Sequence, residues 1–192
     1  MPKVGMEPIR RSALVEATIA EIGAAHSLDV TVGQIARRAG MSTALAHHYF
    51  GGKDQIFLAA MRHILNEYKQ EVLRRLNRQA GDGKARAVAI IEASFDETCF
   101  APDTVSAWMT LYAASRTHPE TRRLLRIYQR RLRSNLTYAL RGISVRPRAD
   151  ADTIAALIDG LYLRVALSQS GRREFARESA LSTLDLILGA SR

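Results

Sequence analysis

Apolar residues recur at intervals of three and four positions along almost the whole chain, and this helical periodicity restricts the fold more than any other feature. Alternating apolar and polar runs, which are typical of half-buried strands, are nearly absent. Glycines and prolines divide the pattern into segments of helical length. We therefore expect an all-α fold of about nine helices, covering residues 8–25, 32–39, 43–50, 53–79, 84–98, 102–116, 119–141, 149–170 and 173–188.

Two domains are expected from the lengths of these segments. Residues 1–53 hold two short helices after the first one, and residues 54–192 hold long helices with short connections, which is typical of a bundle. A chain of 192 residues can bury a core without a metal or a disulfide, and we expect no cofactor. The single cysteine, Cys99, cannot form an internal disulfide, which favours a reducing compartment.

The net charge of +9 is concentrated in one stretch of the chain. Residues 116–148 contain ten arginines and one acid, Glu120, so this stretch carries +9 and the remainder sums to zero. Such a run is most often the solvated face of a helix, and a surface for phosphate or for a partner is the alternative.

No segment of the sequence resembles a membrane or export signal. Residues 1–20 carry Arg10, Arg11 and Glu16 and lack the apolar centre of a signal peptide. The longest uncharged apolar stretch, residues 104–115, is too short to span a bilayer. We expect a cytoplasmic protein with no membrane partner.

Residues 31–50 have the pattern of a helix-turn-helix. Thr31 and Gln34 predict a capping box at the start of one short helix, and Gly40 suits the turn that follows it. Ala36 is small where the two helices approach each other. Ala46 stands where such units usually carry a larger branched residue, so we expect Leu45 or its neighbours to fill that space.

In this motif the second helix enters the major groove of DNA, and its first residues reach the base edges. Small or polar exposed side chains suit that helix. Hydroxyls and backbone N–H groups at helix starts, together with a lysine, suit the phosphates. The DNA-binding candidates lie on the second helix or beside it and are Thr31, Ser42, Thr43, Ala44, His47, His48, Tyr49 and Lys53.

Aromatic and acidic residues of the C-terminal part form a second candidate site. Trp108 and Tyr112 share a helical face because they are four positions apart. A quaternary ammonium ion donates no N–H hydrogen bond, so proteins hold it with aromatic faces and often a carboxylate. The ligand candidates are Phe95, Asp96, Glu97, Trp108, Tyr112, Tyr128 and Tyr162, and core packing is the alternative for the aromatic members.

Asp159 lies within an apolar run and therefore needs a partner. A subunit interface, the ligand pocket and an ion pair with Arg164 are the possibilities. No catalytic motif or metal site is recognisable, so we expect no catalytic residues and no bound metal. A helical-bundle enzyme using Asp96, Glu97 and His118, or a protein that binds partners through residues 122–133, are the alternatives from other classes.

The segments 34–40, 42–43 and 48–50, with Lys53, resemble the DNA-binding head of TetR-family repressors. Further motifs at 2–3, 5–6, 9–11, 95–98, 107–108, 130–132, 134–136 and 156–161 resemble the BetI-type members of that family. This resemblance implies an operator-binding repressor of choline uptake and glycine betaine synthesis genes that choline relieves. Residues 44–47 depart from the group's usual Gly-Ile-Ile-Ser, and Tyr162 replaces a common tryptophan. A TetR-family repressor with another effector is the alternative.

We also expect a homodimer formed by the last two long helices. Apolar residues on these helices predict an isologous four-helix contact, and they are Leu157, Leu161, Leu181, Leu184 and Ile187. A symmetric dimer predicts a palindromic operator.

Overall fold

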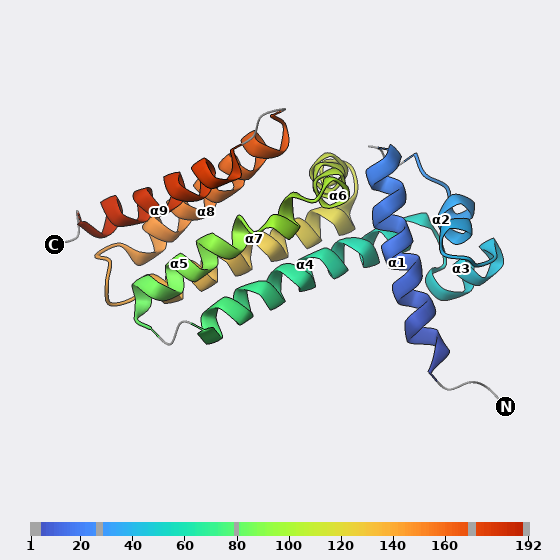
Figure 1. Ribbon diagram of the computed structural model, residues 1–192, viewed down its shortest axis with the longest axis horizontal. Helices are drawn as coiled ribbons and strands as arrows, with labels where there is room; N and C mark the ends of the chain where they lie inside the picture. The colour runs from blue at the N-terminus through green and yellow to red at the C-terminus, as the bar shows by residue number, and fades with distance from the viewer. Residues whose placement is uncertain (1–4, 26–28, 79–80, 169–171, 190–192) are drawn as a thin grey trace. The chain divides into compact units, whose positions relative to one another are not determined.

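The computed structural model describes residues 5–25, 29–78, 81–168 and 172–189. Within these ranges it contains nine α-helices, one 3₁₀ helix and no strand, so the all-α prediction is confirmed (Figure 1). The helices are α1 (Met6–Ala25), α2 (Val32–Arg38), α3 (Thr43–Phe50), α4 (Lys53–Arg78), α5 (Gly83–Ser94), η1 (Glu97–Phe100), α6 (Pro102–Ala114), α7 (Pro119–Leu140), α8 (Pro147–Ala166) and α9 (Arg173–Gly189).

Two predicted helix ends are wrong. α5 ends at Ser94 instead of residue 98, because the Asp96 carboxylate accepts hydrogen bonds from the Thr98 backbone N–H at 3.1 Å and from its hydroxyl at 2.8 Å. This local turn starts η1, so Asp96 follows α5 and does not end it. α8 ends at Ala166, and residues 169–170 of the predicted helix lie outside the described residues.

The chain forms two compact units. Unit 1 comprises Met1–Asn66 and Ala101–Leu125, and unit 2 comprises Glu67–Phe100 and Arg126–Arg192. The border therefore crosses α4 between Asn66 and Glu67. The functional division after residue 53 stays a prediction. No helix in the described ranges is long and apolar enough to cross a membrane.

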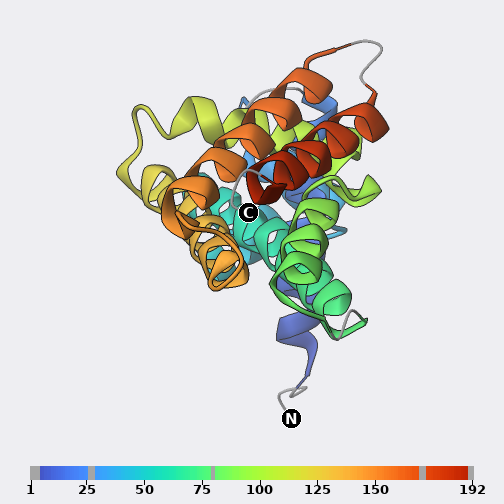
Figure 2. The ribbon, with the colours of Figure 1, turned by 90° about the vertical axis from the view of Figure 1, so that its left-hand side faces the viewer.

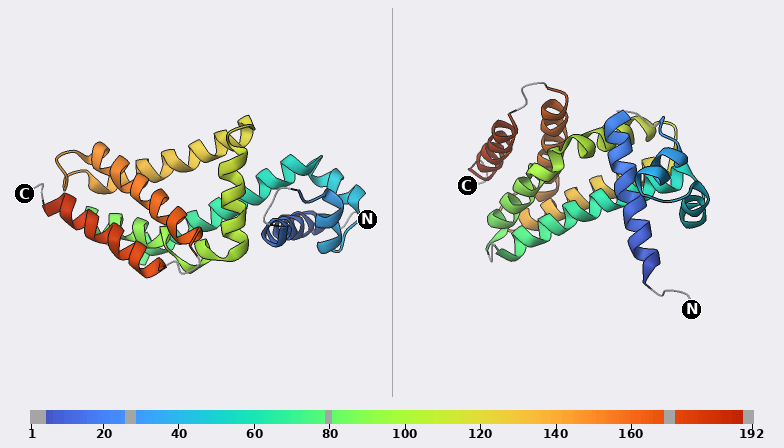
Figure 3. Two further views of the ribbon diagram at one scale, coloured as in Figure 1. Left: turned by 90° about the horizontal axis from the view of Figure 1, so that it is seen from above. Right: turned by 45° about the vertical axis from the view of Figure 1, so that its right-hand side comes forward.

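Unit 1 is organised around α1. α2 packs against α1, α3 packs against α2, and α6 packs along α1, as Figure 3 shows for α1 to α3. At Gly23 the approach of α6 is very close, since an added Cβ would lie 1.9 Å from Asp103 Oδ1 and 2.8 Å from Asp103 Cα. Glycine at this position lets α6, which carries Trp108, rest directly on the helix that supports the helix-turn-helix.

Unit 2 is a bundle with one apolar core. Ile91, Leu136 and Ile154 are completely or almost completely buried there. α8 and α9 run side by side in opposite directions (Figures 1 and 2). Leu184 has 0% of its surface exposed, so assigning it to a dimer face was wrong. Leu184 faces inward on α9 and is one of the buried residues of this core.

Candidate DNA and ligand sites

The predicted capping box fixes the start of α2. The Thr31 hydroxyl accepts a hydrogen bond from the Gln34 backbone N–H at 3.2 Å, and Gln34 Oε1 accepts one from the Thr31 N–H at 2.7 Å. These two bonds satisfy backbone donors that would otherwise lack a partner at the helix end. The predicted capping box is confirmed.

The turn and the start of α3 also follow the predicted chemistry. Gly40 has φ +67°, a left-handed conformation that glycine adopts without steric cost. Ser42 caps α3 by accepting a hydrogen bond from the Leu45 N–H at 3.2 Å. Ala46 has 0% of its surface exposed, whereas Leu45 is half-buried. Alanine itself therefore occupies the buried position of α3, so the larger side chain that we expected from Leu45 is not needed.

The remaining surface of α3 is available to a partner. Thr43, Ala44, His47 and His48 are all exposed in unit 1. The DNA candidates Thr31 and Ser42 are also exposed, and Tyr49 and Lys53 are half-buried. The structure thus brings the eight DNA-binding candidates together on α3 and on the adjoining ends of α2 and α4. Their contacts with DNA stay predictions.

Two arginines near the motif hold unit 1 together. The Arg11 guanidinium donates to the Tyr49 carbonyl at 2.6 Å and lies 4.4 Å from the centre of the Phe50 ring. Arg38 pairs with Glu21 of α1 at 2.5 Å. These contacts join α1 to α2 and α3, so neither guanidinium is a separate, unengaged donor for phosphate.

Unit 2 contains a connected row of aromatic rings. Phe95 stacks on Phe100 with their ring centres 6.3 Å apart, and Phe100 lies 5.0 Å from Tyr162. The Tyr162 hydroxyl donates to the Cys99 carbonyl at 3.0 Å. Burial raises the pKa of the Cys99 thiol to about 12, so the thiol stays protonated at neutral pH, as expected for an inert cysteine.

A second aromatic group, Tyr68 and Tyr128, is linked to Asp159 through Tyr128. Tyr128 of α7 donates its hydroxyl to Asp159 Oδ1 at 3.1 Å. The Tyr128 ring meets the Tyr68 ring edge to face, with 6.0 Å between their centres. Tyr68 in turn bonds to the Ser94 hydroxyl at 3.0 Å, and burial raises its pKa, so its hydroxyl remains neutral.

Asp159 is the carboxylate that stands out in this group. Within the described residues no lysine, arginine or histidine forms an ion pair with it, and Tyr128 is its hydrogen-bond partner. Burial raises the pKa of its carboxyl, and the Tyr128 bond opposes this rise. The Tyr128 hydroxyl already satisfies Asp159 Oδ1, so this oxygen needs neither a subunit interface nor an ion pair with Arg164. A partly buried carboxylate without a cation is costly, so this position favours a cationic ligand.

Sequence reasoning missed Tyr68 and Phe100. The signal for Tyr68 was its register on α4, because it lies four residues after Ile64 and four before Val72, both of which are buried. A tyrosine in line with an apolar stripe points inward, where its hydroxyl needs a partner. Phe100 had no such signal, since the short η1 that orients it was not predicted.

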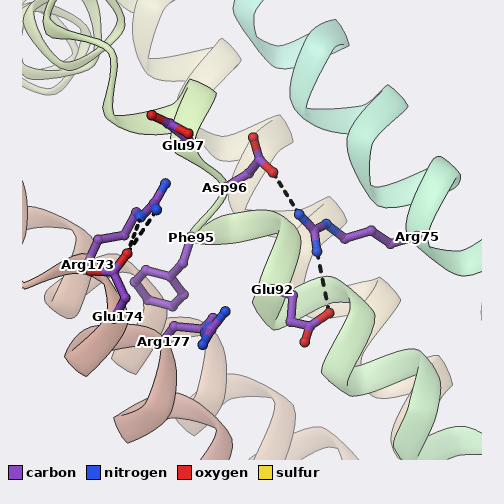
Figure 4. A pocket seen from close by; sticks show the side chains of 8 residues that line it. All are labelled: Arg75, Glu92, Phe95, Asp96, Glu97, Arg173, Glu174 and Arg177. Carbon is purple, nitrogen blue, oxygen red and sulfur yellow. Dashed lines mark hydrogen bonds and ion pairs between the residues drawn. The ribbon is translucent and has the colours of Figure 1, made fainter.

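The predicted acids Asp96 and Glu97 line a different feature, a charged pocket of about 210 Å³ in unit 2. Asp96 pairs with Arg75 at 2.7 Å, and that arginine and the Thr98 bonds lower the pKa of the Asp96 carboxyl against the effect of burial. Figure 4 shows the charged side chains around Phe95; the lining residues are Arg75, Glu92, Phe95, Asp96, Glu97, Arg173, Glu174 and Arg177. Because its oxygens already have partners, Asp96 is less available to a ligand than Asp159.

Trp108 and Tyr112 lie in unit 1 and share a face of α6, as their spacing predicted. Their ring centres are 5.9 Å apart, with Trp108 buried and Tyr112 half-buried. Their roles in ligand binding stay predictions. In the described ranges, no group of three or more His, Cys, Asp and Glu side chains could hold a metal ion.

Comparison with known proteins decides the family. Residues 14–60 match the bacterial regulatory proteins of the tetR family, and residues 83–189 match the C-terminal domain of the BetI-type transcriptional repressor. The chain belongs to the TetR family, in its BetI-type branch. It is 52% identical over 169 residues to the HTH-type transcriptional regulator BetI of Brucella anthropi, which covers 87% of each chain.

Solved structures agree with this fold. A transcriptional regulator from Pseudomonas aeruginosa PAO1 has a TM-score of 0.83 at 22% identity and covers 96% of this chain and 95% of its own. A regulator from Saccharomonospora viridis, solved in complex with choline, has a TM-score of 0.80 at 22% identity, with 91% and 95% covered. The family models and the curated BetI relatives make the chain a DNA-binding regulator of transcription, and they exclude the enzyme alternative because proteins of this family are regulators.

Proposed function

We propose that this TetR-family protein is a cytoplasmic homodimeric repressor that binds a palindromic operator and is released from it by choline. The BetI name of relatives at about half identity supports the gene class. The choline complex of a distant structural neighbour supports the ligand class. The carboxylate of Asp159 and the aromatic side chains of this chain are the residue types that bind a quaternary ammonium ion.

Asp159 is the observation that carries the proposed ligand. Its carboxylate is partly buried, accepts a hydrogen bond from Tyr128 and has no ion-pair partner in the described residues. A quaternary ammonium ion satisfies such a carboxylate without needing a hydrogen-bond acceptor. Aromatic faces contribute roughly 0.5–2 kcal/mol each to a desolvated cation. Tyr68 and Tyr128 have the residue type and the position for this role, and Tyr162 and Phe100 continue the aromatic row.

The proposed release requires choline to prefer a form of the dimer whose two heads no longer fit the operator. A ligand that binds both forms equally shifts nothing. In unit 1, α6 packs on α1 without room for a Cβ at Gly23, so a displacement of α6 is transmitted to α1. Trp108 lies on α6, so a ligand that contacts Trp108 acts on the helix that can transmit a displacement to α1. Trp108 therefore stays a predicted ligand residue.

The proposed dimer uses the outer faces of α8 and α9. Leu186 exposes 74% of its surface and Phe175 exposes 62% on α9. The outward side of α8 carries the small residues Ala156 and Gly160, which allow helices to approach closely. Leu184 is buried and takes no part in this contact. The other predicted residues, Leu157, Leu161, Leu181 and Ile187, are partly buried against the unit 2 core, so the contact is now assigned to the exposed Leu186 and Phe175. Two-fold symmetry then requires a palindromic operator.

Calorimetry with choline tests the ligand. Asp159→Asn keeps the size of the side chain and removes its charge, and it should weaken choline binding at least about tenfold, which corresponds to about 1.4 kcal/mol. Asp152→Asn, an exposed change on the same helix, should leave the affinity unchanged. Unchanged affinity in Asp159→Asn would contradict the proposed carboxylate. Trp108→Ala tests the α6 prediction in the same assay.

A further inference from the structure

A row of exposed arginines lies on α7, outside the helix-turn-helix. In unit 2, Arg126, Arg130 and Arg133 recur at spacings of four and three residues, which places them on one face of the helix. Arg141 follows eight residues after Arg133, directly after α7 ends. All four are exposed, and we name them the arginine row. At 1.5 Å per residue, the row extends over roughly 20 Å.

Carboxylates neutralise very little of this row. Among the described residues, one ion pair reaches it, between Arg133 Nη1 and Asp152 Oδ1 at 3.4 Å, and both side chains are more than half exposed. The single acid of α7, Glu120, lies in its first turn. Like charges three and four residues apart repel each other along a helix. Solvated faces generally interleave both signs of charge, so a row of one sign with a single ion pair favours the alternative of an anionic partner.

The predicted DNA-binding domain carries little net charge by contrast. Residues 1–53 contain six lysines and arginines and four acids. Two of those arginines, Arg11 and Arg38, are engaged inside unit 1. Attraction to phosphates supplies essentially all sequence-independent affinity for DNA. A regulator with a nearly neutral head therefore needs another basic surface to bind DNA in this way.

We propose that the arginine row is a second DNA-contact surface, which binds phosphates of duplex DNA without reading their sequence. Arginine suits this role because its planar guanidinium matches phosphate oxygens with two N–H donors. The row supplies sequence-independent affinity and faster association, whereas α3 supplies the choice of site. This inference rests on the DNA-binding function of the family and not on choline.

Binding to a short duplex of random sequence, measured over a series of salt concentrations, tests the proposal. The variant with Arg126→Gln, Arg130→Gln and Arg141→Gln should bind about tenfold or more weakly at low salt. The slope of log affinity against log salt should become shallower by about 0.9 for each phosphate contact that is lost. A slope equal to that of the unmodified protein overturns the proposal.

A control variant removes the same charge elsewhere in unit 2. It carries Lys69→Gln, Arg78→Gln and Arg177→Gln, all at exposed positions. Binding by this control should stay close to that of the unmodified protein. If both variants lose affinity equally, net charge alone is responsible and the proposed surface is wrong. The single variants Arg126→Gln and Arg141→Gln provide the same slope measurement with smaller disturbance of folding.

Other occupants of the row are distinguished by two further measurements. Sedimentation of the triple row variant should show the same oligomeric state as the unmodified protein, and a change would identify the row as a contact between copies. Binding to vesicles of anionic phospholipid should be weak, and loss of vesicle binding with unchanged DNA binding would overturn the DNA assignment. These assays use neither choline nor the operator, so they can fail independently of the proposed function.

Discussion

Gly23→Ala probes the contact between α1 and α6 that joins Trp108 to the DNA-binding head. A Cβ at this position would lie 1.9 Å from Asp103 Oδ1, which a side-chain rotation could relieve. It would also lie 2.8 Å from Asp103 Cα, and relief of that clash requires a backbone shift. Overpacking of this kind costs about 1–3 kcal/mol, and the better helix propensity of alanine offsets about 1 kcal/mol. Because backbone is involved, we expect a net loss of about 1–2 kcal/mol.

Thermal unfolding followed by circular dichroism measures this loss. For a chain of this length 1 kcal/mol corresponds to roughly 2–4 °C, so Tm should fall by roughly 2–8 °C. Adding Asp103→Ala should restore only part of the loss, since the clash with the backbone of residue 103 remains. Gly52→Ala is the control, because nothing lies within 4 Å of a Cβ there, and it should leave Tm unchanged or raise it slightly. An unchanged or higher Tm for Gly23→Ala would refute the close approach.

Three further predictions concern the head, the dimer and the ligand site. Lys53→Ala should weaken binding to all DNA sequences and lower its salt dependence, whereas His47→Ala should change base preference, as measured by competition between operator variants. Leu186→Asp should shift the dimer to monomer in sedimentation, and Leu73→Asp on exposed α4 surface should not. Asp159→Asn should raise Tm at neutral pH. Burial raises the pKa of the Asp159 carboxyl, which means that its ionised form costs folding free energy. The gain in Tm should disappear in acid, below the pKa of aspartate in the unfolded chain.

The sequence predicted the parts of the structure that local chemistry controls. Thr31, Gln34, Gly40 and Ser42 act over three or four residues, so their caps and turn could be inferred without tertiary contacts. The end of α5 could not be inferred in this way. The Asp96 carboxylate accepts hydrogen bonds from the Thr98 N–H and hydroxyl, and this turn replaces the last turn of the predicted helix.

The ligand site was harder to predict because its residues come together from distant segments. Tyr128 and Asp159 are 31 residues apart, and Tyr162 and Cys99 are 63 residues apart. Periodicity identified which residues face inward but not which helices pack together. It therefore favoured Asp96, whose oxygens bond to Arg75 and Thr98, over Asp159, whose carboxylate has no ion-pair partner among the described residues.

Operator binding in the presence of choline is the most direct test of the proposed function. The operator is first obtained by selecting bound sites from random duplex DNA with the purified protein. Fluorescence anisotropy then measures binding to that operator as choline is added. The proposal predicts that choline at saturation weakens operator binding strongly and that Asp159→Asn protein responds much less. Unmodified protein that stays equally bound to its operator at saturating choline would contradict the proposal.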